Sequence, residues 1–217
     1  MERREVDVEE PIARRERPAP PWQPLMLFLV AVAVILVDHL TKLAIESTLP
    51  LNHSVAPFPE IAHLFRLTHV SNTGAAFGLF QGASPIFIVI ALVVGIVIIF
   101  YNYTLPAGHM LLRVALGLQL GGAFGNLIDR IRLGHVTDFL DFGPWPVFNL
   151  ADAAVVAGVI ILGYLMLQEE AAERVAQAAE RKEALEGEPE QTQQSHLARA
   201  HLSPRHLSEV NPSPKNE

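Results

Sequence analysis

Acidic and amide side chains gather in one stretch of the chain, between residues 121 and 152. In chain order the polar residues are Asn126, Asp129, Arg130, Asp138, Asp141, Asn149 and Asp152. Carboxylates at the ends of membrane-length apolar segments are costly to place there, so a functional role is the default interpretation. Two carboxylates held close together cannot both ionise cheaply, so one serves as acid and the other as base near neutral pH. Such a pair can activate water against a carbonyl and protonate the leaving amine, which is peptide hydrolysis without a covalent intermediate.

Asp138, in HVTDF, and Asp152, in FNLAD, form the predicted acid–base pair, and the sequence leaves open which of the two keeps the proton. Neither has a cation beside it in sequence, whereas Asp129 is followed by Arg130, an arrangement that favours an ionised, structural carboxylate. The residue types leave Asp129 with Asp152 as the alternative pair. Asp141, three residues after Asp138, is predicted to be a solvated loop acid.

Other hydrolytic chemistries lack their residues in this sequence. HExxH and GxSxG are both absent, and no serine in an apolar segment is placed against Lys42 for a Ser–Lys dyad. The chain has no cysteine, which excludes disulfides, thiolate catalysis and cysteine-ligated metal. We therefore expect no metal and no cofactor. The non-enzymatic alternative is a proton-coupled membrane carrier or scaffold, but carriers usually have more spans and polar groups at mid-membrane depth.

Four long apolar runs must position these polar residues. The chain of 217 residues is 50% hydrophobic, and its apolar residues are bunched rather than periodic. Unbroken runs of this length mark bilayer spans and argue against a soluble helical bundle. The predicted fold class is an all-α membrane protein, a bundle of four transmembrane helices. The spans are predicted at about 25–45, 85–102, 110–128 and 147–168.

Two of these runs carry charged residues or closely spaced glycines. Asp38 and Lys42 lie four residues apart and so share one helical face. At a rise of about 1.5 Å per residue, Asp38 lies roughly 20 Å from the helix start, in the outer half of the bilayer. Asp38 and Lys42 are predicted to form a structural ion pair that also helps to shape a functional site. In the third run, Arg113 is predicted to snorkel toward water, and Gly121 with Gly125 forms a GxxxG motif that allows close helix approach.

The termini and connecting segments set the predicted topology. Five arginines precede the first apolar run, which predicts a cytoplasmic N-terminus. No small-residue cleavage site follows that run promptly, so we expect an uncleaved span rather than a signal peptide. Residues 1–24 are a predicted disordered cytoplasmic lead, and 169–217 a cytoplasmic helix, to about 186, followed by a disordered tail. Both termini are then cytoplasmic. The polar groups of the first, third and fourth spans are predicted to meet at the outer membrane face, with Asp138 in the outer loop between the last two spans.

The segment between the first two runs is predicted to lie outside. LFRLTHV (64–70) is typical of a strand, and Asn72 with Gly74 indicates a turn after it. No basic stripe with interleaved aromatics is present, so we expect no nucleic-acid partner.

Five motifs in order resemble those of the lipoprotein signal peptidase (signal peptidase II) family. They are DHLTK (38–42), SNTGAAFG (71–78), GGAFGNLIDR (121–130), VTDF (136–139) and FNLADAAVVAG (148–158). The resemblance covers about 25–168. It implies an aspartyl endopeptidase of the bacterial cytoplasmic (inner) membrane, with its active site at the outer leaflet. The implied reaction removes the signal peptide of a prolipoprotein just before a Cys that carries diacylglycerol. The expected partners are that substrate and membrane lipid, and we expect a monomer.

The resemblance also assigns roles by motif. It implies Asp138 and Asp152 as the catalytic pair, with Asp129 as a structural or supporting residue. It implies a polar shell that supports the pair and binds substrate: Asp38, Lys42, Asn72, Asn126, Arg130 and Asn149. It further implies a small extracytoplasmic β-rich cradle, which fits 51–70. The chain departs from the family pattern in its charged N-terminal lead, its acidic tail and a short loop between the catalytic motifs, which leaves the gating of the site open.

Overall fold

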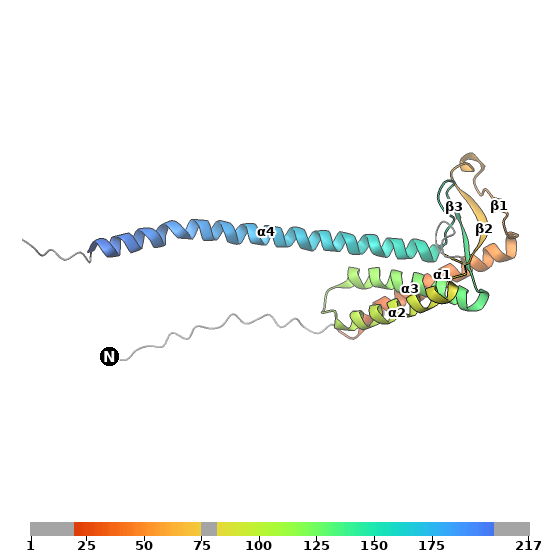
Figure 1. The fold of residues 1–217 in the computed structure, drawn as a ribbon, viewed down its shortest axis with the longest axis horizontal. Coiled ribbons are helices and arrows are strands. Elements are labelled where there is room, and N and C mark those ends of the chain that lie inside the picture. The colour runs from red at the N-terminus through yellow and green to blue at the C-terminus, as the bar shows by residue number, and fades with distance from the viewer. Residues whose placement is uncertain (1–19, 75–81, 202–217) are drawn as a thin grey trace, which may run out of the picture. The chain divides into compact units, whose positions relative to one another are not determined.

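The fold combines four long helices with one small sheet. This computed structural model describes residues 20–74 and 82–201, with side chains to residue 184. All four helices are long and apolar enough to cross a membrane. They are α1 (Trp22–Thr48), α2 (Ser84–Thr104), α3 (Met110–Leu133) and α4 (Leu150–His201). The strands are β1 (Ser54–Val55), β2 (Arg66–Asn72) and β3 (Val136–Asp141), and a 3-10 turn, η1 (Pro59–Ile61), precedes β2. The predicted fold class is confirmed (Figure 1).

The chain divides into two compact units, residues 1–165 and 166–217. The first holds α1, α2, α3, the sheet and the start of α4. In the second, α4 continues to His201, beyond the predicted helix end near 186, because strong helix formers resume after Pro189. Most of the N-terminal lead, residues 75–78 of the SNTGAAFG motif and the end of the tail lie outside the described residues.

Local signals set where the helices end. α2 stops before Pro106, and Leu105 takes the extended backbone that a residue before proline prefers. α3 ends at Gly134, whose left-handed φ of 77° lets its N–H donate to the Arg130 carbonyl at 3.1 Å. The loop after α2 leads into α3, and the turn at Gly134 leads into β3.

Small residues on α3 let its neighbours approach closely. Gly121 faces Ala31 and Val34 of α1, and a Cβ at Gly122 would lie 2.3 Å from the Ala151 carbonyl oxygen of α4. Beside this contact lies an apolar core shared by α1, α2 and α3. Its buried members are Leu27, Ala31, Ile98, Leu105, Leu116 and Leu120.

Arg113 does not snorkel, contrary to the prediction from sequence. Its side chain is fully buried and donates to the carbonyl oxygens of Asn102 at 2.7 Å and Leu105 at 2.9 Å. The last carbonyls of a helix lack partners within the helix, so a guanidinium that reaches them is satisfied without entering water. Arg113 therefore closes the end of α2 against the start of α3.

The sheet is antiparallel, in the order β1-β2-β3. The segment that carries Asp138 was predicted to be a loop, and the structure corrects it to strand β3, which pairs with β2. The register places Val70 opposite Asp138 and Asn72 opposite Val136. Strand β2, from the connection between α1 and α2, thus lies directly beside β3, the strand that follows α3, as Figure 1 shows.

Asp141 is a buried acid of the sheet, so its prediction as a solvated loop residue is wrong. Its Oδ2 accepts hydrogen bonds from Thr68 at 2.7 Å and from Arg66 Nη2 at 3.0 Å. Burial alone would raise the pKa of Asp141, but hydrogen bonds from Thr68, the Gly143 N–H and Arg66 outweigh it and lower that pKa. The acid ties β2 to β3.

The contact at Gly122 predicts a steric cost for a single added methyl group. We expect Gly122→Ala to lower stability by about 1–3 kcal/mol, since the Ala151 backbone must shift to admit the Cβ. Gly163→Ala is the matched control, because a Cβ at that position meets nothing within 4 Å. Thermal unfolding in detergent micelles measures both, and equal melting temperatures would contradict the expectation.

Candidate active site

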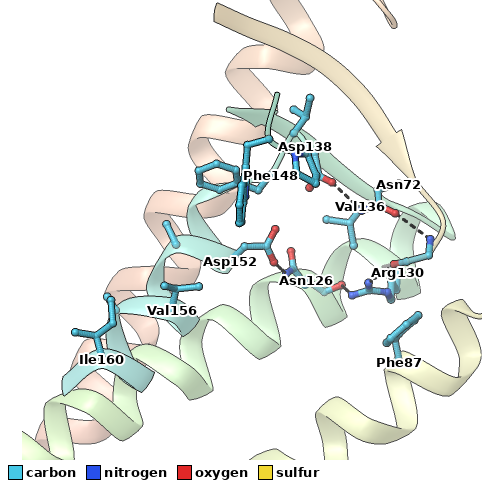
Figure 2. Close-up of a pocket in the computed structure, with 16 residues that line it drawn as sticks. Asn72, Phe87, Asn126, Arg130, Val136, Asp138, Phe148, Asp152, Val156 and Ile160 are labelled. Carbon is cyan, nitrogen blue, oxygen red and sulfur yellow. Dashed lines mark hydrogen bonds between the residues drawn. The ribbon is translucent and has the colours of Figure 1, made fainter. Parts of the chain in front are cut away.

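A cavity of about 670 Å³ lies where β3 approaches α3 and α4. Its polar lining residues are Asn72, Asn126, Arg130, Asp138 and Asp152. The remaining wall is largely apolar and comes from α2, from residues 145–148 and from the first turns of α4. Figure 2 shows Asp138 on the strand and Asp152 on the helix, both reaching this cavity.

Asp152 is held at the start of α4 by a reciprocal helix cap. Asn149 Oδ1 accepts the Asp152 N–H at 2.9 Å, and Asp152 Oδ2 accepts the Asn149 N–H at 3.4 Å. This is the capping-box arrangement, in which two orphan N–H groups of the first turn are satisfied by each other's side chains. The other carboxyl oxygen of Asp152 accepts Asn126 Nδ2 at 2.7 Å. Two hydrogen bonds, one to each oxygen, thus fix the orientation of this carboxyl group.

Asp138 is buried between two amide donors. Asn72 Nδ2 donates to its Oδ2 at 2.8 Å, and Asn149 Nδ2 donates to its Oδ1 at 2.7 Å. Burial, followed by the negative charge of Asp152, raises the pKa of Asp138 to about 7, against the opposing effect of the two amides. Asp138 is therefore mostly protonated below neutral pH.

Two asparagines connect the carboxyl groups without adding charge. Asn149 Nδ2 donates to Asn126 Oδ1 at 3.1 Å as well as to Asp138, and Asn126 Nδ2 donates to Asp152. Asn149 is fully buried, so its amide has no competing water. The arrangement keeps one protonated carboxyl group and a second carboxyl group on the same cavity, which is what acid–base hydrolysis requires.

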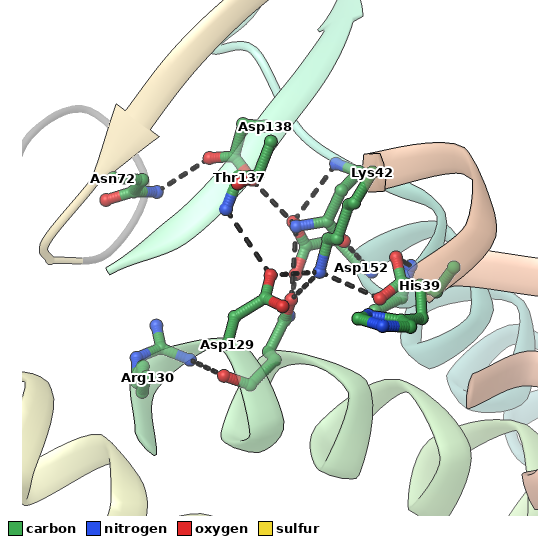
Figure 3. A network of polar contacts seen from close by, with 12 residues as sticks. His39, Lys42, Asn72, Asp129, Arg130, Thr137, Asp138 and Asp152 are labelled. Carbon is green, nitrogen blue, oxygen red and sulfur yellow. Dashed lines mark hydrogen bonds and ion pairs between the residues drawn. The ribbon is translucent and has the colours of Figure 1, made fainter. Parts of the chain in front are cut away.

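Lys42 is the buried cation behind this site (Figure 3). Its Nζ lies 2.8 Å from Asp38 Oδ2, 2.8 Å from Asp129 Oδ2 and 3.0 Å from Asn126 Oδ1. Asp38 also accepts the Ala151 N–H of α4 at 2.9 Å. The ammonium group of Lys42 thus joins α1 to α3, and the carboxylate of Asp38 also bonds to α4.

Asp129 faces Lys42 and does not line the cavity. The cation that holds it is Lys42, distant in sequence, and not the adjacent Arg130 on which the prediction relied. Asp138 and Asp152 thus line the same cavity, whereas Asp129 does not.

Arg130 is the cation on the cavity itself. Its Nη2 donates to the Gly74 carbonyl at 3.2 Å, its Nη1 donates to the Asn126 carbonyl at 3.4 Å, and the guanidinium lies 4.9 Å from the Phe87 ring centroid. Its buried Nε has no hydrogen-bond partner among the described residues.

Some residues of the site were not found from sequence. The capping box has a readable signal, since Asn149 and Asp152 stand three residues apart before an apolar run. Glu46 follows Lys42 by four residues and shares its helical face, and it accepts a hydrogen bond from Thr137. Phe87 and Trp145, on the cavity wall, carry no such signal because their placement depends on packing.

Removing the buried ammonium group should leave two carboxylates without their cation. We expect Lys42→Met to lower the free energy of unfolding by about 3–5 kcal/mol, because Asp38 and Asp129 stay buried and uncompensated. Arg174→Met is the control, since its pair with Glu170 is solvent-exposed and such pairs contribute about 1 kcal/mol or less. Denaturant unfolding in detergent micelles tests both, and comparable losses would show that Lys42 has no special role.

Comparison with known proteins agrees with this geometry. The family model described as signal peptidase (SPase) II matches residues 30–168. The lipoprotein signal peptidase of Moorella thermoacetica is 48% identical over 139 residues, covering 64% of this chain and 91% of that protein. That of Caldanaerobacter subterraneus subsp. tengcongensis is 48% identical over 144 residues, covering 65% and 96%.

Solved structures of bacterial membrane enzymes have a similar fold. A bacterial membrane enzyme solved by the in meso method at 2.3 Å resolution aligns with a TM-score of 0.62 and 32% identity, covering 66% of this chain and 88% of that one. A second, at 1.9 Å, aligns with a TM-score of 0.60 and 31% identity, covering 70% and 97%. The resemblance expected from the five motifs is thus confirmed: the chain is a multi-pass membrane protein that belongs to the lipoprotein signal peptidase (signal peptidase II) family of aspartic peptidases.

Proposed function

We propose that Asp138 and Asp152 are the catalytic acid and base with which this signal peptidase cleaves its substrates. Family membership makes the chain an aspartic-type signal peptidase II. The observation that supports the residue assignment is that the two carboxyl groups line one cavity and are connected through Asn149 and Asn126. The proposed substrates are diacylglyceryl-modified prolipoproteins, which are cut just before the lipidated Cys.

The two carboxyl groups take different roles in the proposed mechanism. Asp152 accepts a proton from a water molecule whose oxygen forms a bond to the scissile carbonyl carbon. Asp138, in its protonated form, donates a hydrogen bond to the carbonyl oxygen as negative charge develops there. Breakdown of the tetrahedral intermediate breaks the C–N bond, and the proton taken from water passes to the leaving amine. The enzyme is then returned to its starting protonation state after the products leave.

The apolar wall of the cavity suits this substrate class. Phe87 from α2 and Val156 and Ile160 from α4 face the cavity, together with Trp145 and Phe148 (Figure 2). Acyl chains and the apolar core of a signal peptide gain free energy by leaving water for such a surface. The polar wall opposite meets the peptide bond, so one cavity can hold both parts of the substrate.

The proposed orientation places the site near the outer leaflet. Five arginines precede α1 and favour a cytoplasmic N-terminus, and four spans return the C-terminus to the same side. Asp38 and Lys42 then lie toward the outer end of α1, on the side of the sheet. We propose the bacterial cytoplasmic membrane as the location. A monomer suffices for the chemistry, because one chain supplies both carboxyl groups. The carrier or scaffold alternative has no comparable support.

Substitution of either carboxyl group tests the assignment. We expect Asp138→Asn and Asp152→Asn each to lower the rate of cleavage of a diacylated precursor by at least about 10²-fold, the contribution typical of a general acid or base. Both amides are close in size to the carboxyl groups, so the variants should stay folded. Asp141→Asn is the matched control on the same strand, because Asp141 contacts Arg66 and Thr68 and does not line the cavity.

The alternative pair predicts a different pattern for the same assay. If Asp138→Asn cleaves normally while Asp129→Asn is inactive, the assignment of Asp138 is wrong. Cleavage is measured with a reconstituted enzyme and a purified precursor, and the melting temperature in micelles shows whether each variant is folded.

The pH dependence follows from the proton on Asp138. Because burial and the charge of Asp152 raise its pKa to about 7, kcat/KM should fall as pH rises through that value and Asp138 ionises. The Asn72 amide lowers this pKa, so Asn72→Leu should move the alkaline limb to higher pH. Initial rates at low substrate concentration across pH 5–9 measure the alkaline limb of kcat/KM for the parent enzyme and for the variant, because this pH range brackets the pKa. A limb that moves to lower pH in the variant would refute this account.

A further inference from the structure

Thr137 is a buried residue that precedes Asp138 on β3 and bonds to two helices. Its Oγ1 donates to Glu46 Oε1 of α1 at 2.5 Å, and its N–H donates to Asp129 Oδ2 of α3 at 3.4 Å. Thr137 is fully buried, and Glu46 is half-buried. Neither residue lines the cavity. Both hydrogen bonds end on carboxylate oxygens, which makes them stronger than bonds to neutral acceptors.

The position of Asp138 depends on more than strand pairing. The β2–β3 register sets where Asp138 lies along the sheet, opposite Val70. It does not set the distance from the sheet to α4, which carries Asp152. That distance depends on the backbone bridge between Leu140 of β3 and Phe148, just before α4, and on the bonds between β3 and the helices. Thr137 supplies two of the bonds to the helices.

Glu46 is placed for this role by the helical repeat of α1. Asp38, Lys42 and Glu46 are each four residues apart, so their side chains share one face of the helix. Lys42 is bound by Asp38 and Asp129, and Glu46 extends the same polar row toward the sheet, where it meets the Thr137 hydroxyl. The row thus ends one residue from the proposed catalytic acid.

We propose that Glu46 and Thr137 are positioning residues that hold β3 against the helices. Asp138 then stays buried and close to Asp152. This inference rests on the proposed function. Without the pair, β3 is held to the helices less firmly and water reaches Asp138. The effects of burial and of the Asp152 charge on Asp138 both weaken, and the acid becomes easier to ionise.

Thr137→Val removes the hydroxyl group and keeps the shape of the side chain. We expect kcat to fall by about tenfold or more, because small displacements of reacting groups cost that much. KM should change little, since Thr137 does not line the cavity. We also expect the alkaline limb to move to lower pH by about half a unit or more, the direction that weaker burial dictates. Thr137→Ser, which restores the hydroxyl group, should return both quantities toward the parent values.

A control variant at another threonine shows whether the effect is specific to Thr137 or follows any Thr→Val substitution. Thr48 is exposed, and its hydroxyl donates to the Ala44 carbonyl of its own helix at 2.6 Å. Thr48→Val should therefore leave kcat, KM and the alkaline limb unchanged. Each enzyme is assayed in micelles with a diacylated precursor, and its folded fraction is measured by thermal unfolding.

Glu46 provides an independent test of the same bond. Glu46→Ala should reproduce the effect of Thr137→Val, whereas Glu46→Gln keeps an oxygen acceptor for the hydroxyl and should remain close to the parent. The double variant Glu46→Ala with Thr137→Val should be no worse than either single variant, because both remove one interaction. Additive losses would overturn the proposal.

The pH profile separates positioning from simple loss of folded protein. A smaller folded fraction scales the rate equally at every pH and leaves the midpoint of the alkaline limb in place, so an unmoved limb in Thr137→Val overturns the inference. Parent-like kcat in that variant overturns it as well. If Asp138→Asn is inactive while Thr137→Val is fully active, only this inference fails. If Asp138→Asn is active, the proposed function itself fails.

Discussion

The buried ammonium group of Lys42 is the interaction on which the arrangement of the site depends. A cation in this position has lost its hydration, which costs several kcal/mol and is offset only by well-placed partners. Its two carboxylates come from α1 and α3, and Asp38 in turn accepts the Ala151 N–H at the start of α4. The positive end of the α4 dipole helps to balance the surplus acid. One ion cluster therefore sets how α1, α3 and α4 meet.

Burial, and after it the negative charge of Asp152, favours the protonated form of Asp138. The carboxyl groups of Asp38, Asp129, Asp138 and Asp152 outnumber the nearby cations, Lys42 and Arg130. Water solvates a buried carboxyl group poorly, so burial and a neighbouring negative charge both favour its protonated form. Asn126 and Asn149 hold the carboxyl groups in place as neutral donors and acceptors, which fixes the geometry without altering the balance. The asymmetry between the two proposed catalytic groups thus comes from their surroundings.

Sequence reasoning succeeded where the signal is local and failed where it depends on distant partners. Apolar runs predicted the four helices, and the polar residues at their rims predicted a shared site. β3 was missed because its strand character comes from pairing with β2, far away in the sequence. The solvated Asp141 and the snorkelling Arg113 were wrong for the same reason, since their partners are Arg66 and the carbonyls that end α2. Adjacent Arg130 was a poor guide to Asp129, whose partner is Lys42.

The cap at the start of α4 makes one residue serve both architecture and chemistry. Asp152 belongs to the capping box that begins the helix, and its carboxyl group also lines the cavity. The reacting group therefore cannot drift along the helix independently of where the helix begins. A single inserted residue between Asn149 and Asp152 would rotate the carboxyl group by roughly 100° about the axis. An insertion there would therefore turn the carboxyl group away from the cavity, even if the helix itself stayed intact.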